Sequence, residues 1–472
     1  MSEQSSRTGG VELSRELGLA ASIAIVIGTV IGSGIFLVPK AMILRVGSPD
    51  MVLAIFVIGG LLSVFGALSY AELAAAMPEA GGEYVYLREA YGPFWGFLYG
   101  WIQTLIAKSG SIAAIATGFM LYCGNFFPLF EQTIFEIPLP IGPGGGPLPI
   151  RYGQVAASSL ILFLAGVNYL GVRIGGVVQT IFTVLKVGLI LAVVVIGLLM
   201  GDGSVSHYTE SITASNTATV GTVTAFFAAM VSALWAYDGW NNLSMVSSEI
   251  KNPSRNLPIS LIMGTLAVMA IYLATNLAYF YVLSPDQVAG ADRVAAEMMR
   301  TILGDTGAAA VSVVAMISMF AALNGSILSG SRVTYAMAKD GLFFQKMAVV
   351  NPEHRTPGNA LLFMSAMAGI LVFSGRYEEI ITYVIFTSWI LYGMTTAAVL
   401  VMRKKRPDLV RPYRTLGYPV VPILFVVAAC CILVSTLLES PRESLMGLSL
   451  IVIAWPFYQY WSRKKLRENV PA

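Results

Sequence analysis

The chain consists of long apolar stretches that are separated by short polar segments. Most stretches are about 20 residues long, which is the length that an α-helix needs to cross the hydrocarbon core of a bilayer. Their apolar residues are continuous rather than alternating, and this excludes a membrane β-barrel. The pattern therefore predicts an all-α membrane protein. Its twelve predicted spans are residues 19–44, 51–77, 92–123, 154–171, 177–200, 220–247, 258–283, 308–335, 358–374, 378–401, 417–438 and 444–462.

Composition and charge agree with this pattern. Of the residues, 56% are hydrophobic and 12% are charged, whereas soluble domains carry about 25% charged residues. If the N-terminus is cytoplasmic, the cytoplasmic connections with the adjoining span ends hold 20 of the 29 Lys and Arg residues and the external ones hold seven. Lys108 and Lys186 lie deeper inside spans. Because Lys and Arg accumulate on the cytoplasmic side, both termini of this multi-pass cell-membrane protein should be cytoplasmic. The charge thus reflects topology, and no nucleic-acid partner is expected.

The connections predict three parts of the chain. We expect a cytoplasmic N-terminal segment at residues 1–18, a helical core at 19–401, and two further helices with a cytoplasmic C-terminus at 402–472. The Pro- and Gly-rich stretch from Gly124 to Gly153 is typical of an external loop without regular structure. The aromatic stretch from Gly81 to Tyr91 favours a short helix at the inner mouth. The first span has no small-residue cleavage site, so we expect it to be retained.

Two spans are interrupted by glycine and polar residues. The first contains Ile27-Gly-Thr-Val-Ile-Gly-Ser-Gly-Ile-Phe36, and the sixth contains Trp235-Ala-Tyr-Asp-Gly-Trp-Asn-Asn242. A glycine inside a helix costs about 1 kcal/mol, and irregular backbone survives in a membrane only where it is buried in protein or lines a wet cavity. Each of the two spans begins one five-helix half, and interruptions at matching positions indicate the binding site of an inverted-repeat transporter. Gly32-Ser-Gly34 alone would also fit a helix-packing face, but the second interruption argues against that interpretation.

The chemistry of the two interruptions suggests the ligand. Free amides at the start of a half-helix bind a carboxylate, and free carbonyls at the end of a half-helix bind an ammonium group. An α-amino acid carries both groups. The candidate substrate-binding residues are Thr29, Val30, Ile31, Gly32, Ser33, Gly34, Trp235, Ala236, Tyr237, Asp238 and Asn241.

Eight stretches of sequence carry a family resemblance. In chain order they are Glu16-Leu-Gly-Leu19 leading to Gly28-Thr-Val-Ile-Gly-Ser-Gly-Ile-Phe36, Tyr70-Ala-Glu-Leu73 with Pro78-Glu-Ala-Gly-Gly-Glu-Tyr84, Tyr91-Gly-Pro-Phe-Trp-Gly96, Asn168-Tyr-Leu-Gly-Val172, Trp235-Ala-Tyr-Asp-Gly-Trp-Asn241, Glu249-Ile-Lys-Asn-Pro253, Asn324-Gly-Ser326 with Ser331-Arg332, and Arg355-Thr-Pro357. Together they resemble the L-type amino-acid transporter family of the amino acid–polyamine–organocation superfamily.

This resemblance implies a LeuT-type fold with two inverted five-helix repeats, unwound helices 1 and 6, and additional helices 11 and 12. It also implies that Trp235 is the aromatic gate over the substrate. The Lys186 ammonium would occupy the place of a cation in sodium-dependent relatives, contacting helix-1 backbone near Gly28 and polar groups of helix 8. Animal members pair with a heavy chain through a cysteine in the loop after helix 3, but Cys123 lies at the membrane end of that helix. A covalent heavy-chain partner is therefore not expected, and a bacterial stand-alone member is favoured.

Ionisable residues inside spans need a partner or a function, because each costs at least about 2.5 kcal/mol at the bilayer centre. Lys186 lies too far from either end of its span to reach the interface, which favours a coupling role. For Lys108 we expect a structural role, in which polar neighbours on its own helix solvate the ammonium group. Asp238 pairs with Lys108, recognises a cationic ligand, or holds the interruption together through Tyr237 and Asn241. The tight turn at the following glycine favours the last of these alternatives.

Other classes of protein lack the residues they need. An intramembrane aspartyl protease requires a second carboxylate beside Asp238, and the other aspartates lie in connections or at span edges. His207 and His354 lie in loops, away from any serine nucleophile in a span, and polar residues do not form a continuous pore lining. The chain contains no metal-ligand cluster and no nucleotide-binding motif, so no cofactor is expected.

The sequence predicts a protein in contact with membrane lipid that exchanges small neutral L-amino acids independently of sodium. Cationic amino acids as further substrates and proton-coupled symport as the mechanism stay open.

Overall fold

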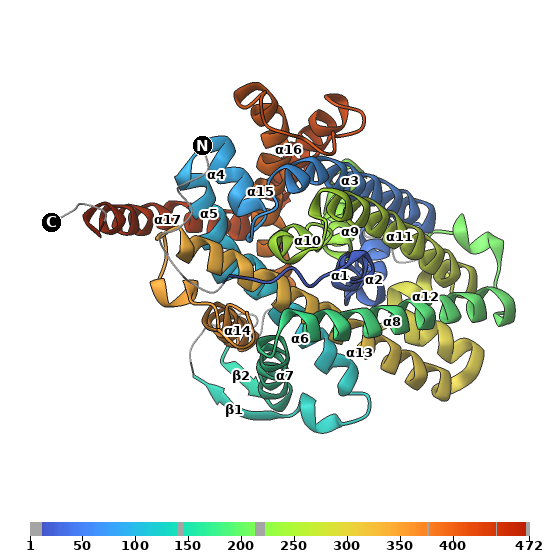
Figure 1. The fold of residues 1–472 in the computed structure, drawn as a ribbon. Helices are drawn as coiled ribbons and strands as arrows, with labels where there is room; N and C mark the ends of the chain where they lie inside the picture. The colour runs from blue at the N-terminus through green and yellow to red at the C-terminus, as the bar shows by residue number, and fades with distance from the viewer. Residues whose placement is uncertain (1–11, 139–145, 213–221, 375–376, 440, 469–472) are drawn as a thin grey trace.

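The computed structural model describes residues 12–138, 146–212, 222–374, 377–439 and 441–468. Two helices, α1 (Leu19–Val30) and α2 (Gly34–Val46), follow one another near the middle of a helical bundle (Figure 1). Residues 1–11 of the predicted N-terminal segment lie outside the described part of the chain. Within it, Leu17 pairs with Ile250 in an isolated β-bridge, so this segment contacts the connection that precedes α11 (Pro253–Val282).

The helices around this centre are mostly long. In chain order, the other α-helices among the described residues are α3 (Pro49–Ala76), α4 (Glu83–Tyr91), α5 (Pro93–Ile102), α6 (Lys108–Cys123), α7 (Tyr152–Tyr169), α8 (Val172–Met200), α9 (Thr222–Tyr237), α10 (Asn242–Met245), α11, α12 (Pro285–Gly290), α13 (Val294–Lys339), α14 (Gly358–Val372), α15 (Tyr377–Lys405), α16 (Val420–Glu439) and α17 (Pro441–Glu468). A π-helical turn at Gln103–Ala107 joins α5 to α6.

The helices match a multi-pass membrane protein. Within the described residues, eight helical stretches are long and apolar enough to cross a membrane, when α1 with α2 and α5 with α6 each count as one stretch. Two shorter apolar helices, at Thr224–Tyr237 and Gly358–Val372, are also present. The prediction of a helical membrane protein is therefore confirmed.

The connection between α6 and α7 corrects one prediction. The stretch from Gly124 to Gly153 was expected to lack regular structure, but β1 (Thr133–Ile137) and β2 (Leu148–Arg151) form an antiparallel hairpin. Strand β1 is rich in β-branched and aromatic residues, which favour extended backbone, and β2 pairs with it although it contains Pro149. The Pro and Gly residues between them dominated the prediction, and residues 139–145 lie outside the described part of the chain. The other named elements in the described part of the chain are helices, and the short helix expected between Gly81 and Tyr91 is confirmed as α4.

The two predicted interruptions are present, and glycine permits both. α1 ends at Val30 and α2 begins at Gly34, while α9 ends at Tyr237. A Cβ atom on Gly34 would lie only 2.5 Å from the Cα atom of Ala236, so the two interrupted helices touch through backbone at this point. Gly239 has a φ angle of 105°, a left-handed value that other residues rarely adopt. Glycine is thus required at both places where the backbone leaves the helix.

Candidate functional site

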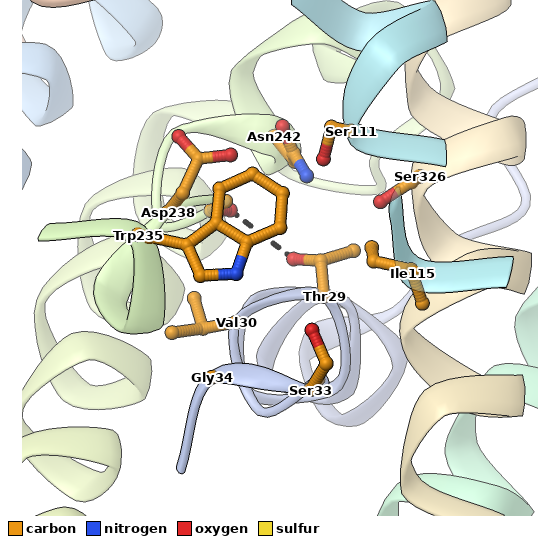
Figure 2. Close-up of a pocket in the computed structure, with 12 residues that line it drawn as sticks. Thr29, Val30, Ser33, Gly34, Ser111, Ile115, Trp235, Asp238, Asn242 and Ser326 are labelled. Carbon is orange, nitrogen blue, oxygen red and sulfur yellow. Dashed lines mark hydrogen bonds between the residues drawn. The ribbon is translucent and has the colours of Figure 1, made fainter. Parts of the chain in front are cut away.

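The two interruptions meet at a single small cavity (Figure 2). Helices α1 and α2 form one wall, α9 and the turn after it form another, and α6 and α13 complete the lining. Seven of the eleven candidate residues line the cavity: Thr29, Val30, Gly32, Ser33, Gly34, Trp235 and Asp238. The sequence therefore identified both walls that are made of interrupted helix.

The first wall presents backbone amides. Gly34 is the first residue of α2, and the first N–H groups of a helix have no partner within the helix. Among the described residues, the amides of Gly32 and Gly34 donate no hydrogen bond to another backbone group. Unpaired amides at a helix N-terminus are suited to bind an anionic group such as a carboxylate.

The two walls are joined by hydrogen bonds. The Thr29 hydroxyl lies 2.7 Å from the Ile25 carbonyl oxygen of its own helix and 3.1 Å from the Gly239 carbonyl oxygen of the second interruption. The Tyr272 hydroxyl, from α11, lies 3.0 Å from the Val30 carbonyl oxygen and 2.9 Å from that of Ala236. These contacts hold the ends of α1 and α9 beside one another.

Four candidate residues do not line the cavity. The Ile31 carbonyl faces α8 and α13, Ala236 packs against Gly34, and Tyr237 donates a hydrogen bond to the Phe56 carbonyl oxygen of α3 at 2.9 Å. The fourth, Asn241, points to the other side of the turn, where its amide donates to the buried carboxylate of Glu83 on α4. Once the backbone leaves helical geometry, neighbouring side chains point in unrelated directions.

Five lining residues were not among the candidates. These are Ser111 and Ile115 on α6, Gly239 and Asn242 at the second interruption, and Ser326 on α13. The polar pattern at residues 238–242 could have included Gly239 and Asn242. Ser326 belongs to one of the family stretches, but nothing in that stretch indicates a place at the cavity. Ser111 and Ile115 carry no local signal, because only the packing of distant helices brings α6 to the cavity.

Lys186 lies behind the first interruption, on α8. Its side chain is fully buried, and its ammonium group donates hydrogen bonds to the carbonyl oxygens of Gly28 at 2.7 Å and Ile31 at 2.6 Å. The Ser318 carbonyl oxygen of α13 lies 3.4 Å away, and the Ser318 hydroxyl also donates to the Ile31 carbonyl at 2.9 Å. A cation at the carbonyl end of a helix is electrostatically favourable. The structure thus places this ammonium where α1, α8 and α13 meet.

Asp238 and Lys108 have different partners from those expected. The Asp238 carboxylate accepts a hydrogen bond at 2.8 Å from the Tyr392 hydroxyl of α15. Neither Tyr237 nor Asn241 donates to it among the described hydrogen bonds, which corrects the expectation that those two residues hold it. The correction has a topological cause, because Tyr392 comes from a helix far away in the sequence. Lys108 donates to the Asn242 side-chain oxygen at 2.6 Å.

The gate candidate Trp235 lies between the two walls, with its indole ring across the cavity in the view of Figure 2. Trp235 is buried. Cys123 is also buried, at the end of α6. Within the part of the chain that the structure describes, no group of three or more His, Cys, Asp or Glu side chains is placed to hold a metal ion.

The sequence of the chain is similar to those of known amino-acid transporters. The sequence model of the amino acid permease family matches residues 17–455. The chain is 35% identical over 461 residues to the serine/threonine exchanger SteT of Bacillus subtilis, which covers 97% of this chain and 98% of that protein. It is 31% identical over 454 residues to the human b(0,+)-type amino acid transporter 1, with coverage of 96% and 88%. It is also 30% identical over 466 residues to the mouse large neutral amino acids transporter small subunit 2, with coverage of 98% and 84%.

Proposed function

The chain belongs to the amino acid permease family, within its L-type amino-acid transporter branch, and from this membership we propose that it exchanges L-amino acids across the cell membrane by alternating access. Its relatives are transporters rather than enzymes. The SteT relative is named as an exchanger, which supports exchange over uptake without a counter-substrate.

The observation that carries this proposal is the meeting of two helix interruptions at one cavity. The substrate carboxylate binds the unpaired amides of Gly32 and Gly34 at the start of α2, where the helix dipole also favours negative charge. The substrate ammonium binds near the carbonyl end of α9, and Trp235 covers the substrate. Backbone groups can thus recognise the parts that all α-amino acids share, without a charged side chain.

The proposed topology has twelve spans. Helices 1–5 and 6–10 form two inverted repeats within a transport core at residues 19–401, and helices 11 and 12 follow it within residues 402–472. The eight long apolar helices and the two shorter ones support this arrangement, with α7 and α17 as the remaining two spans. Both termini are cytoplasmic in this proposal, as the distribution of Lys and Arg indicates.

Sodium independence is the next part of the proposal. A bound sodium ion would require oxygen ligands from α1 and α13, and the Lys186 ammonium already takes the Gly28 and Ile31 carbonyl oxygens. A fixed positive charge at this position makes a bound cation unnecessary. The alternative is proton-coupled symport, in which the titratable side chain of Lys186 would carry the coupling proton.

The proposed substrates are small neutral L-amino acids. Cationic substrates are a second class, and Asp238 beside the cavity would supply the complementary charge. A stand-alone transporter surrounded by lipid is favoured over a covalent complex with a heavy chain, because Cys123 is buried.

Counterflow in proteoliposomes tests the proposal. Purified protein is reconstituted, and uptake of labelled serine, alanine, leucine, arginine and cystine is measured into vesicles that are empty or loaded with the same unlabelled amino acid. Exchange predicts uptake only into loaded vesicles, with no change when choline replaces sodium. Uptake into empty vesicles that follows an inward proton gradient and disappears with a protonophore would instead support proton symport. Absence of uptake of any amino acid under every condition would refute amino-acid transport.

A further inference from the structure

The side-chain amide of Asn242 has a hydrogen-bond partner at its oxygen atom but none at its nitrogen atom among the described residues. Its side-chain oxygen accepts a hydrogen bond from the Lys108 ammonium at 2.6 Å. Its side-chain nitrogen Nδ2 has no hydrogen-bond partner among the described residues, although the residue is only 1% exposed. Figure 2 shows this nitrogen pointing toward the cavity that Asn242 lines. An unpaired donor in a buried polar cavity is unfavourable unless a ligand supplies an acceptor.

Lys108 fixes which end of the amide faces the cavity. An ammonium group has three donors and no acceptor, so it must face the oxygen of the Asn242 amide. In the flipped orientation two donors would oppose one another, and the cavity would receive the oxygen instead. Lys108 is itself buried, with 3% exposure. The lysine thereby presents the NH2 group to the cavity.

The position of Asn242 in the cavity determines which part of a bound substrate lies beside it. In Figure 2, Ser33 and Gly34 lie on one side of the cavity, whereas Asn242 and Ser111 lie on the other. A substrate whose carboxylate binds at Gly34 therefore extends its remaining atoms toward Asn242. Gly239 leaves room for the amide, because a Cβ atom there would lie 3.2 Å from Nδ2.

We propose that Asn242 donates a hydrogen bond to an acceptor atom on the substrate side chain, and that Lys108 is the positioning residue that orients it. This inference rests on the proposed function. The transporter then prefers small amino acids whose side chain carries a hydroxyl or amide oxygen over apolar ones of the same shape. The cavity-lining serines on α6 and α13 add to the polar character of this end.

Asp238 is the competing explanation for any such preference. It also lines the cavity, and its carboxylate can accept a hydrogen bond from a substrate hydroxyl. Tyr392 already donates to one of its oxygens. The two explanations differ in the direction of the hydrogen bond: Asn242 donates to the substrate, whereas Asp238 accepts from it.

Competition between isosteric substrates tests the proposal. Threonine and valine have nearly the same shape, as have serine and 2-aminobutyrate, so the ratio of their inhibition constants against labelled serine isolates the hydroxyl group. We expect wild-type protein to bind threonine about tenfold more tightly than valine, the value of one hydrogen bond. Asn242→Leu should reduce the ratio to about one. Lys108→Met, which keeps an apolar stem but loses the ammonium, should reduce it to about threefold or less because the amide can then flip.

Matched controls separate recognition from folding. Asn241→Ala changes the neighbouring amide, which contacts Glu83 instead of the cavity, so it should alter both inhibition constants alike and leave their ratio unchanged. Ser244→Ala, which removes another donor to Glu83, is a second control of this kind. A wild-type ratio near one, or a ratio that survives Asn242→Leu and disappears in Asp238→Asn, would overturn the inference while leaving exchange itself intact. Failure of the proposed function would instead appear as no amino-acid uptake in wild-type protein.

Discussion

Replacing Lys186 with alanine should impair transport far more than folding. In the native structure the ammonium holds the carbonyl oxygens of Gly28 and Ile31, at 2.7 and 2.6 Å. The substitution leaves Ile31 with the Ser318 hydroxyl as a partner. The Gly28 carbonyl oxygen is then left without a hydrogen-bond donor in the described structure, because α1 ends at Val30 and has no further helical amide to offer it.

The magnitude follows from these contacts. Each charge-assisted hydrogen bond contributes about 1.5–3 kcal/mol, so the two together contribute about 3–6 kcal/mol. Burial of the ammonium costs several kcal/mol and offsets much of this gain, which leaves a net loss of stability of about 1–3 kcal/mol. The same bonds attach α1 to α8 in one conformation. A change of about 3 kcal/mol in the balance of two conformations alters their ratio about a hundredfold, so the exchange rate should fall at least about tenfold.

The assay compares Lys186→Ala with wild-type protein in proteoliposomes, after thermal unfolding in detergent has shown that the variant is folded. Lys251→Ala is the matched control, because Lys251 is exposed and its loss should change neither quantity. We also expect no leak of amino acid from vesicles that contain Lys186→Ala. A folded variant with wild-type exchange kinetics would refute this account. A steep sodium dependence of wild-type uptake would refute it independently, by showing that the ammonium does not serve as the cation.

Blocking either charged group of a substrate, as a methyl ester or an N-acetyl derivative, should abolish competition, because the helix ends at the cavity recognise both groups; broad acceptance of blocked amino acids would exclude this binding mode. Asp238→Asn should weaken arginine binding about tenfold while leaving leucine unchanged, because an asparagine oxygen still accepts from Tyr392. Equal losses for both substrates in competition assays would show a structural role instead. Glu249→Gln should destabilise the protein by about 3–5 kcal/mol, because it leaves the fully buried Arg332 without its ion-pair partner. In the same thermal assay the exposed pair of Arg300 and Asp305 is the control, and Asp305→Asn should change stability by less than about 1 kcal/mol.

The helix interruptions could be predicted from sequence because their cause is local. Glycine and polar residues in the middle of an apolar stretch identify places where a helix cannot continue unsupported, and both interruptions occur within the indicated residues. The directions of individual side chains could not be predicted. Tyr237 and Asn241 belong to the same turn as Asp238, yet they bind α3 and α4 instead of the cavity, because helical periodicity ends where the interruption begins.

Hydrogen-bond partners that come from distant helices could not be predicted either. Asp238 is held by Tyr392, and Lys108 by Asn242, across separations that no local pattern encodes. The hairpin of β1 and β2 was missed for a different reason. The Pro and Gly residues between the two runs favour irregular backbone, and this signal outweighs the short runs of residues that form the strands.

The two buried lysines connect the interrupted helices to their surroundings in corresponding ways. Lys186 reaches from α8 to the Gly28 and Ile31 carbonyls of the first interruption, and Lys108 reaches from α6 to Asn242 at the second. The interrupted helices are also tied to one another, so motion that opens the cavity must change contacts between this pair and the surrounding helices. Lys186 contacts backbone outside the cavity, and its loss should lower the maximal exchange rate with little change in the apparent KM. Lys108 acts on a cavity-lining amide, and its loss should instead change the apparent KM for hydroxylated substrates. Lowered affinity for valine in Lys186→Ala, or an unchanged threonine KM in Lys108→Met, would contradict this division of roles.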